Sequence, residues 1–199
     1  MVRTAIGGLV GGLVLFVMGF VFWATPLSDL AFSKAGDVQS AAVQQAMAAN
    51  LTESGTGAYI VPGMRSAQSA VLYAKGPIAT VFYNTRGYSP EDYSMILPGF
   101  IVALIAGLFL SFGLSAVAGQ RSFAERARLV VLIALAFTTW EFLGSPIFNH
   151  FGWGYWIYTF IAESVVWIAA GLVVARWFLP GAVAVTQAPE TAAMAAAAE

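Results

Sequence analysis

The sequence contains no cysteine and a single histidine, and charged residues make up only 10% of its 199 residues. The lack of cysteine excludes disulfides, thiolate metal sites and catalytic thiols, and a lone histidine excludes a bis-histidine haem or metal site within one chain. Nine Lys and Arg are balanced by ten Asp and Glu, so there is no basic surface to bind nucleic acid. An average soluble domain carries about 25% charged residues. This scarcity of charge indicates an integral membrane protein.

What is present instead is hydrophobic sequence, 59% of the chain, much of it gathered in long runs. A helix needs about 20 mostly apolar residues to cross a bilayer. The predicted spans are residues 1–24, 95–118, 129–148 and 155–177. The first begins like a signal peptide, but its long apolar run and the lack of a clean Ala-x-Ala site favour a retained anchor. The predicted fold is an all-α membrane protein with four transmembrane helices and a small mixed α/β outer subdomain between the first two.

The orientation follows from the basic residues of the short connections. Residues 119–128 form a predicted inner loop with three arginines, whereas the outer turn at residues 149–154 has no Lys or Arg. This asymmetry predicts a bacterial inner-membrane protein with both termini in the cytoplasm and residues 25–94 in the periplasm. Residues 178–199, rich in alanine, are predicted to be a disordered inner tail.

The outer segment, residues 25–94, is too long for a bare connector, so part of it is expected to fold. The sequence predicts a helix over residues 38–49 with Asp37 as its N-cap, and a short strand at residues 59–61. Residues 71–74 and 78–83 flank Lys-Gly-Pro and predict a hairpin. Ser89 predicts an early start for the second span's helix. The segment is either a lid or docking surface for a partner, or a small cap over the helix ends.

Two carboxylates inside the predicted spans, Glu141 and Glu163, are the sharpest chemical feature, because a charge in hydrocarbon is costly. Each lies eleven residues from Gly152, so an antiparallel helix pair places both at a similar depth. Facing each other, they would form a proton or cation site, with His150 as a third ligand or proton exchanger. Alternatively, Glu141 lies at the wet interface while Glu163 is satisfied by hydrogen bonds inside the bundle. Contact with a head group or substrate is a third possibility.

Small and aromatic residues mark the ends of the spans. Two overlapping Gly-x-x-x-Gly pairs allow helices to approach closely, either within the chain, in a homo-oligomer or with a membrane-protein partner. They are formed by Gly7, Gly8, Gly11 and Gly12. Tryptophans near the span ends are expected at the membrane–water interface. They are Trp23, Trp153, Trp156 and Trp177.

Motifs for nucleophilic catalysis, zinc-dependent proteolysis and phosphate binding are missing from the sequence. We therefore expect no enzymatic activity, no cofactor and no metal. The leading interpretation is a structural or accessory membrane protein acting through helix packing and its outer loop. The alternative is a proton- or cation-coupled transporter or channel component that uses Glu141 and Glu163. A lipid-modifying enzyme is a third hypothesis.

Four spans with a large first outer loop are also found in claudin-like and tetraspanin-like proteins and in quinone-linked disulfide oxidoreductases, but those families depend on cysteines. The chain more closely resembles a group of uncharacterised four-helix bacterial inner-membrane proteins. The shared features are the Gly-rich first span ending at Phe22-Trp23, the Ala/Val/Gln segment at residues 38–49, residues 57–62 (Gly-Ala-Tyr-Ile-Val-Pro) and Gly76-Pro77. The resemblance implies the topology and an envelope location only.

Overall fold

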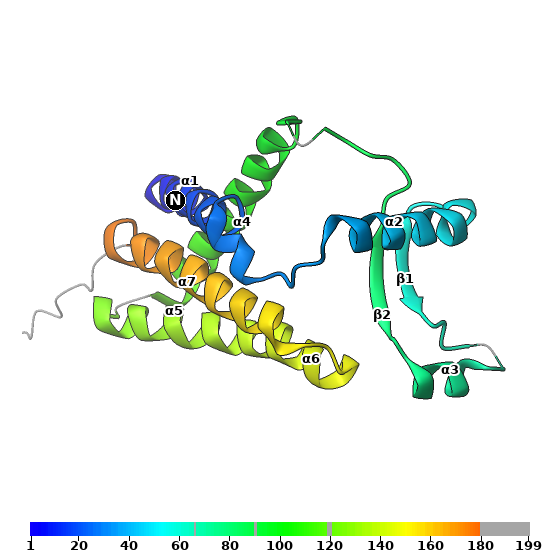
Figure 1. The fold of residues 1–199 in the computed structure, drawn as a ribbon. Coiled ribbons are helices and arrows are strands. Elements are labelled where there is room, and N and C mark those ends of the chain that lie inside the picture. The colour runs from blue at the N-terminus through cyan, green and yellow to red at the C-terminus, as the bar shows by residue number, and fades with distance from the viewer. Residues whose placement is uncertain (66, 90, 119–120, 180–199) are drawn as a thin grey trace, which may run out of the picture. The chain divides into compact units, whose positions relative to one another are not determined.

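The structure is a computed structural model that describes residues 1–65, 67–89, 91–118 and 121–179. The described chain is mostly helical, with one small sheet (Figure 1). Its α-helices and strands are α1 (Val2–Trp23), α2 (Asp37–Leu51), β1 (Gly57–Val61), α3 (Ser69–Lys75), β2 (Ala79–Tyr83), α4 (Ile96–Ala118), α5 (Phe123–Thr138), α6 (Gly144–Asn149) and α7 (Trp153–Trp177). The chain divides into a helical unit, Met1–Phe32 with Ser94–Glu199, and an outer unit, Ser33–Tyr93.

Four helical segments are long and apolar enough to cross a membrane, which confirms the coarse fold prediction. They are Val2–Trp23, Ile96–Val117, Phe123–Asn149 and Trp153–Trp177. The third begins six residues before its predicted start at residue 129, because its charged first turns are part of the same helix. Its helical length suits a multi-pass membrane protein as well as the other three do.

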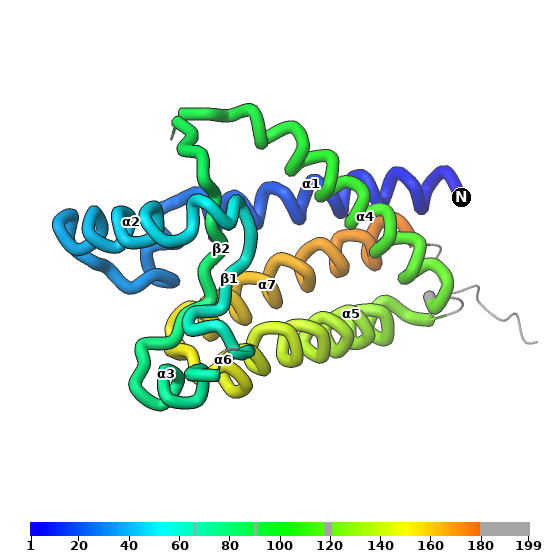
Figure 2. The backbone as a smooth tube through the Cα atoms, turned by 90° about the vertical axis from the view of Figure 1, so that its right-hand side faces the viewer, coloured from blue at the N-terminus to red at the C-terminus, as the bar shows by residue number. Residues whose placement is uncertain are grey.

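Within the helical unit, α1 packs against α4 on one side and α7 on the other, and α7 in turn packs against α5 (Figures 1 and 2). The order across the unit is therefore α4, α1, α7, α5. One apolar cluster joins Leu15 of α1 to Val166 and Ala170 of α7. Another joins Leu114 of α4, Val130 of α5 and Val174 of α7. These contacts leave α1 and α7 as the central pair.

The third span is not a uniform α-helix. It begins with a capping box, in which the Ser122 hydroxyl accepts from the Glu125 backbone N–H and the Glu125 carboxylate accepts from the Ser122 N–H. A π-helical turn over Thr139–Leu143 separates α5 from α6. Pro146 explains this turn, because it has no N–H to donate to a carbonyl one turn earlier. In the same turn, the Ser145 hydroxyl donates to the Glu141 carbonyl oxygen at 3.3 Å.

The outer unit holds a two-stranded antiparallel sheet in which Gly57 of β1 pairs with Tyr83 of β2. The predicted strand at residues 59–61 and helix at 38–49 are both confirmed, although Gly36 rather than Asp37 occupies the N-cap. The predicted hairpin is wrong, since residues 71–74 belong to α3 and β2 pairs with β1. A short apolar run does not by itself distinguish helix from strand, and here Gly76, with a φ of 60°, ends a helix.

Two further expectations concern the ends of segments. The prediction that the helix starts near Ser89 is wrong, because α4 begins at Ile96. The Ser89 carbonyl oxygen accepts from the Asp92 N–H. Pro98 lies in the first turn of α4, where a missing N–H costs little. The predicted tail lies outside the described residues except for Phe178 and Leu179, and Leu179 is buried.

Candidate functional site

The clearest polar contact within the predicted membrane region joins α1 to α7. The indole Nε1 of Trp23 donates a hydrogen bond of 3.1 Å to the Oε1 of Glu163, and both side chains are half-buried. Trp23 is the last residue of α1, and Glu163 lies in the middle part of α7. The antiparallel arrangement of these helices brings the two together. This contact corresponds to the alternative in which Glu163 is satisfied by hydrogen bonds inside the bundle.

Aromatic rings surround this hydrogen bond. The Tyr158 hydroxyl donates to the Phe22 carbonyl oxygen at 2.6 Å, at the end of α1 where carbonyls have no helical partner. The rings of Trp23 and Tyr158 meet edge to face with centroids 5.4 Å apart, and Trp23 also packs near Tyr155 at 6.2 Å. The cluster fixes the end of α1 against α7 and partly shields the Glu163 carboxylate.

Glu141 lies in the π-helical turn of the third span, and its side chain is exposed in the isolated chain. In the described part of the chain no hydrogen bond joins it to Glu163. The reason is that neighbouring side chains of α7 point toward different helices. Ser164 points at α5, where its hydroxyl lies 2.8 Å from that of Thr138, so the adjacent Glu163 turns about 100° away, toward α1. The two acids therefore do not share a face of the helix pair.

His150 ends α6 in a left-handed conformation with a φ of 55° and is exposed. No hydrogen bond links it to Glu141 or Glu163 in the ranges that the structure describes. Those ranges also contain no group of three His, Asp or Glu side chains placed to hold a metal ion. The structure thus does not bring the three predicted ligands together.

The four glycines of the Gly-x-x-x-Gly pairs in α1 are buried within the chain. A Cβ added at Gly8 would lie 2.8 Å from the Leu108 Cα, and one at Gly12 would lie 2.6 Å from the Leu104 Cα, both in α4. On the adjacent face, Gly11 meets Val174 of α7 and Gly7 meets Phe178. Of the alternatives left open by the sequence, the glycines here serve packing inside the chain.

Three of the four predicted interface tryptophans occupy helix ends. Trp153 and Trp177 are the first and last residues of α7, and both are exposed. Trp23 ends α1. Trp156 instead lies one turn into α7, where its ring stacks on that of Phe151 with centroids 6.2 Å apart.

Two features were missed by reasoning from the sequence. The first is the Thr138–Ser164 contact between α5 and α7, in which both side chains are buried. The second is a cavity at the opposite end of the helical unit, lined by Arg3, Arg121, Arg126 and Arg176. The sequence signal for this cavity was available, because the same arginines at the span ends indicated the orientation, but nothing in their spacing showed that they converge.

Comparison of the chain with models of protein families, with curated proteins and with solved structures gave no match.

Proposed function

We propose that the chain is a multi-pass protein of a bacterial inner membrane with both termini in the cytoplasm. The support is the distribution of arginines over the helical unit. Arg3, Arg121, Arg126 and Arg176 line one end, and the connection at the other end, residues 150–152, has no Lys or Arg. Positively charged residues in short loops favour the cytoplasmic side. The envelope location agrees with the resemblance to four-helix inner-membrane proteins.

Within that membrane, we propose a non-enzymatic role as a structural or accessory subunit that binds a partner membrane protein through the outer unit. One observation carries this proposal: no described residue between Ser33 and Tyr93 is buried. The unit's sheet has only two strands, and an isolated two-stranded sheet is marginally stable in water. A segment that lacks a core of its own needs another surface to stabilise it.

The side chains on the surface of the outer unit fit that need. Phe82 of β2 is 86% exposed and Val38 of α2 is 79% exposed. Met64 and Val71 are exposed as well. Exposed apolar residues at this density are typical of protein–protein or membrane contacts. Aromatic and methionine side chains are enriched at protein interfaces, which favours a protein partner.

The helical unit supports the same role by its rigidity. Glycine contacts lock α1 onto α4, and the Trp23–Glu163 hydrogen bond locks it onto α7. Among the described residues no hydrogen bond joins Glu141 to Glu163, which favours this role over the transport hypothesis. What remains is a scaffold that holds the outer unit at the membrane.

The test is to isolate the tagged full-length chain from its own membrane in mild detergent and measure the mass and composition of the assembly. The account predicts a second protein in fixed stoichiometry. The Phe82→Ser variant is expected to lower the yield of this second protein at least fivefold. Thr80→Ser, in the same strand two residues away, serves as the matched control and is expected to leave the yield unchanged. Isolation of an assembly of this chain alone would contradict the proposal.

A further inference from the structure

The arginine end of the helical unit contains a cavity of about 410 Å³. The arginines come from four places: Arg3 from α1, Arg121 from the connection before α5, Arg126 from the first turn of α5 and Arg176 from the last turn of α7. Arg126 is only 4% exposed. A buried arginine in a membrane protein is costly and marks a functional site by default. A guanidinium group matches the oxygens of a phosphate, so four arginines lining one cavity suit a phosphate group.

The charge of the cavity is positive. No acidic residue lines it in the part of the chain that the structure describes. The nearby Glu125 carboxylate accepts from the backbone N–H and hydroxyl of Ser122, at 2.7 and 2.9 Å, and is close enough to Arg121 to attract it. Arg3 uses one donor on the Trp177 carbonyl oxygen, and Arg176 stacks over the Phe123 ring at 5.5 Å. Since a guanidinium has five N–H donors, both retain donors for a ligand.

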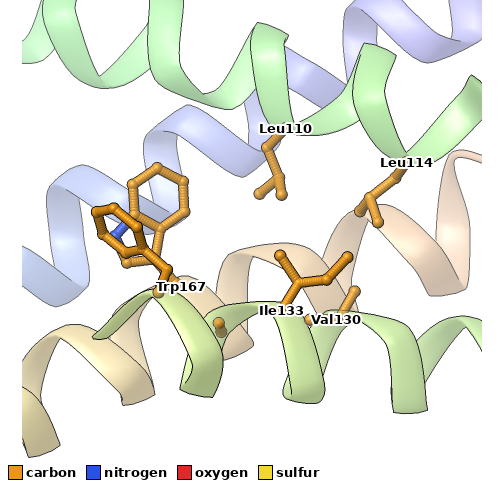
Figure 3. A pocket seen from close by; sticks show the side chains of 7 residues that line it. Leu110, Leu114, Val130, Ile133 and Trp167 are labelled. Atoms are coloured by element: carbon orange, nitrogen blue, oxygen red, sulfur yellow. The ribbon is translucent and has the colours of Figure 1, made fainter. Parts of the chain in front are cut away.

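An apolar groove of about 280 Å³ shares α5 and α7 with this cavity and is completed by α4. Leu110 and Leu114 of α4 face Val130 and Ile133 of α5 across it, and Trp167 of α7 closes one end (Figure 3). The remaining lining residues are Ala134 and Phe137. The groove is therefore entirely apolar, like the acyl region of a bilayer.

The groove and the cavity adjoin each other. Leu114 and Val130 line the groove, Ala175 and Leu179 line the cavity, and these four pack in one cluster. Along α5 the distance from Arg126 to Phe137 is eleven residues, or about 16 Å at 1.5 Å per residue. Half of a 30 Å hydrocarbon core is about 15 Å. The combined feature therefore matches one leaflet in depth.

We propose that this site binds one anionic phospholipid, with its phosphate head group in the arginine cavity and one acyl chain in the groove. Four arginines, with no acid among the described lining residues, favour a head group of net negative charge over a zwitterionic one, whose ammonium they repel. Basic pockets between transmembrane helices are known to bind anionic head groups. The proposal does not depend on the accessory function.

The test is a lipid titration of the purified full-length chain, stripped of lipid, followed by native mass spectrometry. Phosphatidylglycerol and phosphatidylcholine with identical acyl chains are compared, and inorganic phosphate is added in a separate arm. Arg121→Gln removes one exposed arginine from the cavity. Arg128→Gln is its matched control, because Arg128 is also exposed, lies seven residues further along the chain in α5 and does not line the cavity. Ile133→Trp fills the groove, and Leu13→Trp, on the exposed face of α1, controls for added bulk.

The expected result is one phosphatidylglycerol per chain, bound at least tenfold more tightly than phosphatidylcholine. Arg121→Gln is expected to weaken binding about fivefold, and Ile133→Trp to weaken it by a similar factor, while both controls stay within twofold. Equal losses for Arg121→Gln and Arg128→Gln would show only diffuse charge attraction and overturn the site. If inorganic phosphate displaces the lipid and Ile133→Trp has no effect, the site takes a soluble phosphate and the lipid proposal fails.

Discussion

Trp23 and Glu163 are joined across α1 and α7 by a hydrogen bond of 3.1 Å, so the acid within the fourth span has a structural partner. The indole is neutral and donates one hydrogen bond, which gives one carboxylate oxygen a partner without a second charge. This contact accounts for a carboxylate in an apolar helix through packing. Through this contact Glu163 faces α1. The sequence had suggested that it shares a site with Glu141.

The Trp23–Glu163 bond is expected to contribute measurable coupling to stability. Interhelical hydrogen bonds in membrane proteins contribute about 0.6 kcal/mol on average and up to about 1.7 kcal/mol. A double-mutant cycle of Trp23→Phe and Glu163→Leu, measured by unfolding in detergent, is expected to give a coupling energy in that range. Glu163→Gln keeps an acceptor oxygen and is expected to retain most of it.

The control for this cycle pairs Trp23→Phe with Glu141→Leu. Because the structure places no contact between these two side chains in its described ranges, their effects should add to within about 0.5 kcal/mol. Equal coupling in both cycles would show that the effect is not specific to the observed hydrogen bond.

Because α1 and α4 touch at glycines, the effect of a Gly→Leu substitution on stability is expected to depend strongly on its position in α1. Gly8→Leu drives a side chain into the Leu108 backbone, which cannot move without displacing α4. Overpacking of this kind typically costs about 1–3 kcal/mol, and the melting temperature is expected to fall. Gly19→Leu, on the same helix, is the matched control because an added Cβ there meets no atom within 4 Å.

The same variants decide whether the glycines also serve an oligomer contact. If they pack only within the chain, Gly8→Leu lowers stability without producing a smaller, stably folded assembly. A folded variant with normal melting temperature and reduced assembled mass would instead assign the glycines to an intermolecular interface.

Much of the fold follows from local sequence patterns. The four spans are encoded by long apolar runs, and the start of α5 is encoded by the Ser122–Glu125 capping box, whose partners are three residues apart. Both depend on hydrophobicity or short-range geometry. The pairing of β2 with β1 cannot be read from such local patterns, because several apolar runs in the outer segment were suitable partners for β2. Tertiary context selected β1.

The candidate site shows the same limit. Equal spacing from Gly152 predicts a similar depth for Glu141 and Glu163, but it does not predict the direction in which each side chain points. That direction is set by the contact of Thr138 with Ser164 and by the π-helical turn before Pro146. Likewise, Gly-x-x-x-Gly predicts close helix approach without naming the partner helix.

Because Glu141 and Glu163 do not form a pair, we expect that neither acid supports coupled transport. Glu141→Gln and Glu163→Gln, singly and together, are expected to leave any ion flux in proteoliposomes at the level of protein-free vesicles, as in the wild type. The measurement is pH-driven proton or cation uptake. A pH-dependent flux in the wild type that disappears in the folded double variant would revive the transport hypothesis.

The outer unit provides the most direct test of the accessory role, because it has no buried residue among those described. The measurement is amide hydrogen exchange of β1 and β2 in two samples: the assembly isolated from its own membrane, and the purified chain alone in lipid vesicles. The account predicts slow exchange in the native assembly and fast exchange in the chain alone, because the partner supplies the missing contacts. Equal exchange in both samples would contradict it.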